Sequence, residues 1–302
     1  MRGTAASRAR ERRDLAGRGT VRLRLALLWA EWLQKEVLEL VPHRHVVLTM
    51  PRLLRGIFRN ARSEFGRSSS IAIASRSLGR KRRELLLDLS QCAAEALAEY
   101  MRIRVGPDTR PGIVVSIATS GDLLPWHPHG HILTTDGAFA DDGAFHPLAT
   151  WDGEAVMKLF RERLLARLLD RHAISEDPVR KLLAWRHPGF SAHVGEAIAS
   201  ADKKAIEDVA CYLVRAPLSL KKLVCLDGQK AVLYRSRMNP SLGRNFEAMD
   251  PLEWLARLAG HIPDPGKHRT HFYAHYANRV PGERPSKRCG GATVPRSPAS
   301  PS

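Results

Sequence analysis

The fold is decided between residues 112 and 135, where the chain reads Gly112-Ile-Val-Val-Ser-Ile-Ala-Thr-Ser-Gly-Asp-Leu-Leu-Pro-Trp-His-Pro-His-Gly-His-Ile-Leu-Thr-Thr135. The apolar, β-branched run from Gly112 to Ala118 predicts a buried strand. Gly121-Asp122 predicts a turn, and the residues from His127 to Thr135 predict the next strand. Because a short turn separates the two runs, we expect an antiparallel pair. Asp136-Gly137 turns the chain again.

Strands and helices alternate on both sides of this pair. Further strands are predicted over residues 45–50, 191–198 and 231–236. Apolar positions at helical spacing predict helices over residues 22–41, 84–101, 154–170, 177–185, 202–215, 251–260 and 270–280. We find no internal repeat. This alternation predicts an α+β fold.

The chain is strongly basic. Its 302 residues carry 48 Lys and Arg against 31 Asp and Glu, a formal net charge of +17. Such an excess indicates a polyanionic partner, DNA or RNA, because neutralising phosphates releases counterions. The alternative is a chain that merely uses Arg freely. We expect residues 1–24 to form a mobile basic arm, residues 25–280 one domain, and the Pro- and Ser-rich residues 281–302 a disordered tail.

The cysteines and apolar runs exclude several classes of protein. The four cysteines form no Cys-x-x-Cys pair, which argues against a disulfide framework or a cysteine zinc site and favours a reducing cytoplasm. No apolar run approaches the roughly 20 residues that cross a bilayer, so we expect no membrane contact. Arg24 interrupts the apolar stretch from Leu23 to Ala30, which predicts an amphipathic helix and not a signal peptide.

Three histidines alternate at the start of the second strand. Since residues two apart share a strand face, His127, His129 and His131 point the same way. Imidazoles are common ligands of divalent metals, so the spacing predicts half of a metal site. A structural zinc site and a polar strand end that binds nothing remain alternatives. Further ligand candidates are Asp122, His43 and His45.

Two tyrosines near the end of the chain form the second candidate group. In the predicted 270–280 helix, Tyr273 and Tyr276 lie on one side. A tyrosine hydroxyl, with a pKa of about 10, is a weak nucleophile at neutral pH, but a metal or a nearby base can make it attack phosphorus. The alternative is ordinary aromatic packing.

Together these motifs resemble a known family. Pro128-His-Gly-His131 is similar to the His-x-His metal motif of the HUH nucleases, which include rolling-circle replication initiators, relaxases and some transposases. The wider context resembles the two-tyrosine rolling-circle transposases of bacterial insertion sequences. Their landmarks are similar to residues 43–51, 121–131, 135–139, 185–190, 212–217, 261–263 and 273–279, in family order.

The resemblance implies a fold and a mechanism. The fold would be an HUH-endonuclease-like antiparallel sheet flanked by helices. His129, His131 and His127 would hold Mg²⁺ or Mn²⁺ against the scissile phosphate of single-stranded DNA. Tyr276 or Tyr273 would attack and keep the 5′ end as a phosphotyrosine, and the released 3′ hydroxyl would later rejoin the strand. The implied function is DNA transposition, with the element ends and the target as partners.

The sequence also departs from the family's pattern. The family's Cys-rich segment before the first helix is absent, because the first cysteine is Cys92, so we expect a truncated copy. Phe272 stands four residues before Tyr276, where the family has its other tyrosine. These departures keep open a catalytically impaired, DNA-binding remnant. A relaxase, a replication initiator or a metal protein unrelated to DNA are further alternatives.

Overall fold

The computed structural model describes residues 23–59, 75–185, 189–218, 220–226, 230–239, 243–263 and 266–277. The predicted basic arm lies almost wholly outside these ranges, and the predicted tail entirely outside them. Within the described residues, no helix is both long and apolar enough to cross a bilayer.

A five-stranded sheet in the order β11-β3-β4-β1-β7 forms the centre of the molecule. Its strands are β1 (His43–Thr49), β3 (Gly112–Ser120), β4 (Trp126–Thr135), β7 (Ser191–Ile198) and β11 (Thr270–Ala274). All neighbouring strands run antiparallel. The predicted pair of strands is thereby confirmed as β3 and β4, whose apolar residues are almost completely buried.

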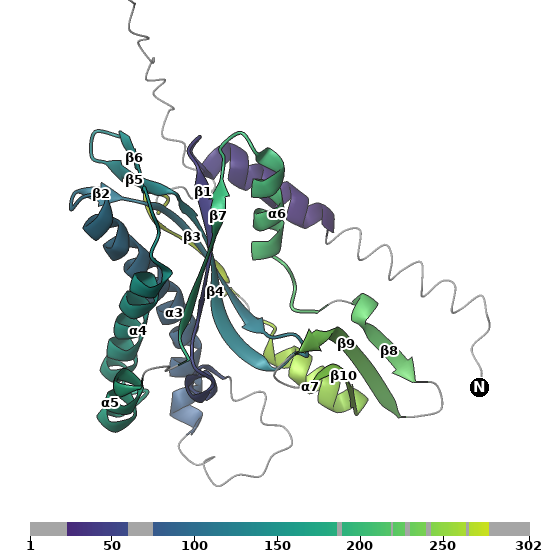
Figure 1. Cartoon of the computed structure of the whole chain (residues 1–302). Coiled ribbons are helices and arrows are strands. Elements are labelled where there is room, and N and C mark those ends of the chain that lie inside the picture. Colours follow the sequence, from purple (N-terminus) through teal and green to yellow (C-terminus); the bar gives the residue numbers. More distant parts are fainter. Residues whose placement is uncertain are drawn as a thin grey trace, which may run out of the picture.

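Helices cover both faces of this sheet, as Figure 1 shows. On one face lie α3 (Ser75–Arg104), α4 (Gly153–Asp170) and α5 (Glu176–Ala184), which enclose the main core. On the other lie the helix over residues 23–32, its π-helical end Leu33–Val37 (η1) and α6 (Lys203–Leu213). The first helix ends before the predicted residue 41. The predicted α+β fold, an antiparallel sheet flanked by helices, is confirmed.

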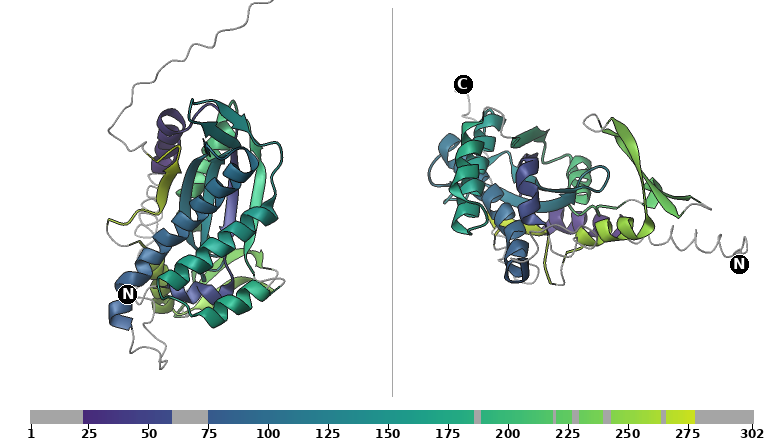
Figure 2. Two further views of the ribbon diagram at one scale, coloured as in Figure 1. Left: turned by 90° about the vertical axis from the view of Figure 1, so that its left-hand side faces the viewer. Right: turned by 90° about the horizontal axis from the view of Figure 1, so that it is seen from below.

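Two smaller three-stranded sheets complete the fold. One contains β8 (Leu223–Leu226), β9 (Ala231–Asn239) and β10 (Arg244–Met249); it packs with α7 (Pro251–Gly260) on the β3–β4 turn and projects from the main sheet (Figure 2). The other contains β2 (Thr109–Arg110), β5 (Gly137–Ala140) and β6 (Phe145–Pro147). The chain that turns back at Gly137 therefore pairs with β2 and β6, and not with β4. A short helix, α2 (Arg52–Arg55), and 3₁₀ turns at Gly56–Phe58 and Leu220–Lys222 lie in the connections.

The helix predicted for residues 270–280 is wrong. Residues Thr270–Ala274 form the edge strand β11, which pairs with β3 from Ser116 to Gly112. Threonine and aromatic residues favour strands, and the exposed edge of β3 offers them backbone partners. Ala274 then takes a positive φ of 52°, which ends the strand. In a strand, Phe272 and Tyr273 point to opposite faces. The expectation that Tyr273 and Tyr276 lie on one side of a helix therefore no longer applies.

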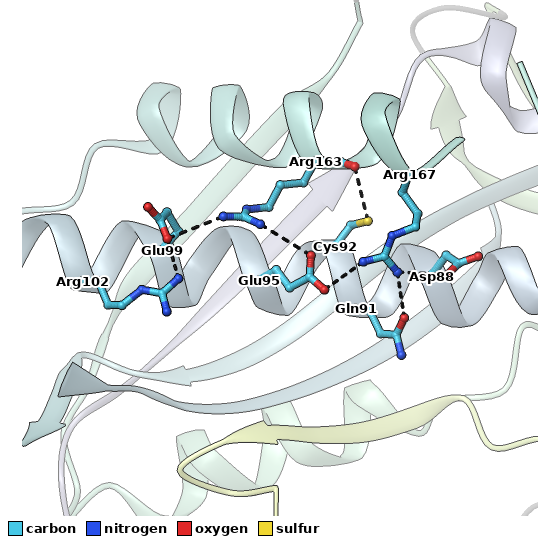
Figure 3. Close-up of polar contacts among 8 residues, drawn as sticks. All are labelled: Asp88, Gln91, Cys92, Glu95, Glu99, Arg102, Arg163 and Arg167. Carbon is cyan, nitrogen blue, oxygen red and sulfur yellow. Dashed lines mark hydrogen bonds and ion pairs between the residues drawn. The ribbon is translucent and has the colours of Figure 1, made fainter. Parts of the chain in front are cut away.

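Charged side chains join α3 to α4 across their interface (Figure 3). Arg167 donates to Asp88 at 3.1 Å, to Gln91 at 3.0 Å and to Glu95 at 3.0 Å. The Asp88 side chain is 1% exposed and accepts a further hydrogen bond of 2.9 Å from Arg171. A buried carboxylate needs such partners because it has lost its hydration.

We expect Arg167→Ala to lower the free energy of unfolding by roughly 2–4 kcal/mol, since it leaves Asp88 partly unpaired in the interface. Urea denaturation measures this change. The matched control is Arg102→Ala, which removes only a solvent-exposed pair with Glu99 and should cost less than about 1 kcal/mol. Equal losses in the two variants would show that the α3–α4 network is not stabilising.

Candidate active site

The predicted histidine cluster forms on one face of the central sheet. On β4, His129 and His131 point to this face, and their Nε2 atoms lie 3.0 Å apart. His45 of β1 joins them, with its Nε2 atom 3.3 Å from Nδ1 of His131. His127 lies beside His129, with ring centroids 4.9 Å apart and the rings tilted by 39°. The alternating spacing on the strand therefore brings all three predicted histidines together, and cross-strand pairing adds a fourth.

The surroundings keep these rings uncharged at neutral pH. Burial, helped by repulsion from His129 and His45, lowers the pKa of His131 to about 3. Burial and repulsion from His129 lower the pKa of His127 to about 4, and burial also lowers that of His129. A histidine that binds a metal has to be a neutral imidazole, so these rings would not first have to lose a proton to bind a cation.

The hydrogen bonds also fix which ring nitrogens can act as ligands. Nδ1–H of His129 donates to the carbonyl of His127 at 2.7 Å, so its Nε2 presents a lone pair towards His131. A proton on Nδ1 of His131 would be accepted by His45, which frees Nε2 of His131 as well. This arrangement, in which the outer nitrogen of each ligand is held by a neighbour, is usual around metal sites.

The distance between the Nε2 atoms of His129 and His131 fits two ligands of one metal ion. Two ligands about 2.1 Å from one ion, on neighbouring positions, lie about 3 Å apart, which is the spacing found here. Nε2 of His127 is buried and has no hydrogen-bond partner among the described residues. Among all the residues that the structure describes, no three His, Cys, Asp or Glu side chains converge as they would around an ion. Asp122 therefore does not join the cluster, and the remaining coordination would have to come from elsewhere.

Tyr212 lies beside these histidines. Its ring stands perpendicular to that of His131, with centroids 4.8 Å apart, and 6.0 Å from that of His45. The residue is 44% exposed. The hydroxyl of Ser116 on β3 donates to the carbonyl of Leu213 at 2.6 Å, which fixes the last turn of α6 against the sheet.

Sequence reasoning gave Tyr212 no chemical role, although a signal was present. The buried stripe of α6 is Ile206, Ala210 and Leu213, at helical spacing. Tyr212 lies outside that stripe at the helix end, so the apolar face that α6 buries does not account for it. What the sequence does not show is that this helix end meets β4.

The structure does not bring Tyr276 beside the histidine pair. Its side chain is fully buried, and its hydroxyl lies 2.8 Å from Nε2 of His43 and accepts from the backbone N–H of Glu39. Its ring lies so close to Gly112 that a Cβ there would come within 2.3 Å of it. His43 pairs with Thr135, four residues along β4 from His131, which corresponds to about 13 Å.

Tyr273 lies on the opposite side of the sheet. Its hydroxyl donates to Ser90 of α3 at 2.9 Å, and burial raises its pKa. Phe272 shares the face of the histidines, but its ring packs edge-on against Trp32 at 6.0 Å. The roles predicted for Tyr273 and Tyr276 stay predictions, and their surroundings are those of packed side chains.

The contact between His43 and Tyr276 predicts a dependence of stability on pH. Burial lowers the pKa of His43 to about 4, from 6.5 in the unfolded chain. The unfolded state therefore binds a proton first as the pH falls, and the folded state loses stability between pH 6.5 and 4. We expect His43 to contribute a loss of about 2 kcal/mol between pH 7 and pH 5.

Urea denaturation at pH 7 and pH 5 measures this loss. The His43→Gln variant cannot titrate at that position, so its stability should fall by about 2 kcal/mol less than that of the unchanged protein over the same interval. A fall of the same size in both proteins would show that His43 is already charged in the folded state.

Comparison with known proteins defines the class. The Y2_Tnp family, described as "Putative transposase", matches residues 112–284, more than half of the 302 residues. The chain therefore belongs to this family of transposases. The matched segment contains β3, β4, the His127–His131 cluster and Tyr212.

The chain is also similar to a particular curated protein, the transposase for insertion sequence element IS801 of Pseudomonas savastanoi pv. phaseolicola. The two are 27% identical over 214 residues, which is 67% of this chain and 51% of the relative. The chain thus spans about half the length of that relative. No solved structure matches the chain.

Proposed function

We propose that this protein nicks and rejoins single-stranded DNA in transposition, through a metal-assisted tyrosine nucleophile. The observation that supports this most strongly is the exposed Tyr212, whose ring lies 4.8 Å from that of His131, one of two histidines with paired ligand nitrogens. Family membership and the similarity to a named insertion-sequence transposase agree with it.

His129 and His131 would hold a Mg²⁺ or Mn²⁺ ion, and His127, whose Nε2 atom has no hydrogen-bond partner among the residues that the structure describes, is the further candidate on the same strand. Bound there, a divalent cation supplies a Lewis acid for a phosphoryl oxygen. His45 acts as a positioning residue, because its Nε2 atom can hold the proton of Nδ1 of His131.

Tyr212 is the tyrosine that the geometry favours as nucleophile. It combines exposure with a place beside the histidine pair, whereas Tyr276 is fully buried and Tyr273 lies on the far side of the sheet. In the proposed step, the tyrosine oxygen loses its proton and bonds to phosphorus. The bond from phosphorus to O3′ breaks, and the 3′ oxygen takes up a proton. The 5′ end stays on the protein as a phosphotyrosine, and the reverse step rejoins the strand.

The charge and the cysteines suit this function. A formal charge of +17 attracts the phosphate backbone of element ends and target alike. The described cysteines Cys92, Cys211 and Cys225 are free thiols, as in a reducing compartment, and we propose the cytoplasm as the place of action.

A nicking assay tests the proposal. The protein is incubated with labelled single strands from the element's ends, with Mn²⁺ or with EDTA, and separated on a denaturing gel. We expect a metal-dependent covalent adduct. Salt-sensitive binding without an adduct under any metal would instead identify a DNA-binding remnant. Binding no tighter than that of an equally basic control protein would overturn the assignment to DNA altogether.

A further inference from the structure

A cavity of about 470 Å³ opens beside the candidate active site. It lies between β3, the residues that follow α6, the end of α7 and the segment before β11. Its volume is typical of sites that take small molecules, which span roughly 300–1,000 Å³. Neither the proposed metal site nor the proposed tyrosine nucleophile uses it.

Two contacts connect the cavity to the reacting groups. Ala118 lines it, and Ala118 is the cross-strand partner of His129. Arg215 also lines it, with a guanidinium group 5.9 Å from the centre of the Tyr212 ring. The cavity therefore lies next to the position that the proposed function gives to the scissile phosphate.

The walls of the cavity are apolar, and its polar side chains are donors. Aliphatic side chains on facing elements, Leu213, Leu258 and Ile262, supply the walls. The side chain of Arg269 is half-buried and donates to the carbonyl of His261, which leaves other N–H groups of its guanidinium unused. Burial lowers its pKa, and no carboxylate in the described part of the chain offsets this.

His261 also lines the cavity, but its ring nitrogens are engaged. One lies 3.0 Å from the hydroxyl of Thr119 and the other 3.1 Å from the carbonyl of Leu124. No side-chain carboxylate, amide or hydroxyl is among the lining residues that are described. A ligand there meets guanidinium donors between aliphatic surfaces.

We propose that this cavity binds one unpaired base of the DNA strand next to the scissile phosphate, and that it prefers guanine to adenine. Apolar side chains hold the faces of an extruded base. Guanine offers two acceptors, O6 and N7, which match a guanidinium group, whereas adenine places an N–H₂ donor against it. The placement next to the scissile phosphate rests on the proposed function, but the base preference does not require cleavage.

The test measures binding without chemistry. Fluorescence anisotropy in EDTA compares a 5′-labelled strand of twelve deoxyadenosines with strands in which one central base is guanine or hypoxanthine. Hypoxanthine keeps O6 and N7 and lacks the amino group of guanine. We expect both substituted strands to bind roughly 5- to 100-fold more tightly than the all-adenine strand.

Two variants locate the preference. Ala216→Phe fills the cavity from its loop, and Arg269→Gln removes the half-buried guanidinium group, the one that we propose reads the base. Each variant should bring the ratio of the affinities for the guanine and all-adenine strands close to one, with the affinity for the all-adenine strand changed less than about threefold. Thermal melting identifies a variant that fails to fold. The control, Arg237→Ala on the exposed part of β9, should weaken all strands alike.

Equal affinities of the unchanged protein for all three strands would overturn the proposal, and so would an undiminished guanine preference in either folded variant. A guanine preference without any covalent adduct in the nicking assay would support the base pocket and reject the proposed chemistry. A covalent adduct without any base preference would support the proposed chemistry and reject the base pocket.

Discussion

We expect Tyr212→Phe to abolish the covalent protein–DNA adduct that we propose, to less than roughly one thousandth of the unchanged protein's rate. The substitution removes the nucleophilic oxygen and keeps the ring that packs against His131. The measurement is the initial rate of adduct formation on a labelled single strand with Mn²⁺. Binding of the same strand in EDTA should change less than about threefold, because the hydroxyl contributes to the chemistry and not to the charge of the site.

Tyr276→Phe and Tyr273→Phe are the matched controls. Each removes a hydroxyl from a buried contact, to His43 and to Ser90 respectively, and should cost about 1 kcal/mol of stability. Both variants should still form the adduct at a rate within about threefold of the unchanged protein. The opposite pattern, with the adduct lost in Tyr276→Phe and kept in Tyr212→Phe, would restore the role that the sequence motif predicts.

We expect His129→Ala and His131→Ala each to reduce adduct formation at least about a hundredfold. Stabilisation of the transition state by a bound cation is worth several kcal/mol, and each 1.36 kcal/mol corresponds to a factor of ten. The rate is measured against Mn²⁺ concentration. His45→Ala should cost less, about 10- to 100-fold, and more Mn²⁺ should restore part of the rate, because the role we propose for His45 is only to hold the ring of His131.

The control for the histidine variants is His193→Ala. His193 lies on the neighbouring strand β7, opposite Val47, and it makes no hydrogen bond to the pair of ligand nitrogens. Its loss should leave both the rate and the Mn²⁺ dependence nearly unchanged. A hundredfold loss in His193→Ala, or a full rate in His129→Ala, would contradict the assignment of the metal ligands.

Local patterns predicted the parts of the site that depend on local geometry. The strand from His127 to Thr135 puts alternating side chains on one face, so His129 and His131 had to meet wherever this strand lay. The turn at residues 121–122 and the apolar run before it likewise determined the β3–β4 pair. These features need only the residues next to them in the chain.

The remaining features depend on contacts between distant segments. The segment from Thr270 to Ala274 is a strand because the edge of β3 is available to it, which no local pattern records. The place of Tyr212 follows from a hydrogen bond between Ser116 and Leu213, 97 residues apart. The same long-range packing brings His45 to His131 and creates the cavity beside them.

We propose that Tyr212, next to His129 and His131, carries the 5′ end of the cleaved strand. The most direct measurement is to form the adduct with a short labelled oligonucleotide and Mn²⁺, digest the protein with trypsin and identify the DNA-linked peptide by mass spectrometry. We predict the peptide that contains Tyr212 and ends at Arg215. A nucleotide linked to the peptide with Tyr273 and Tyr276 would contradict the claim.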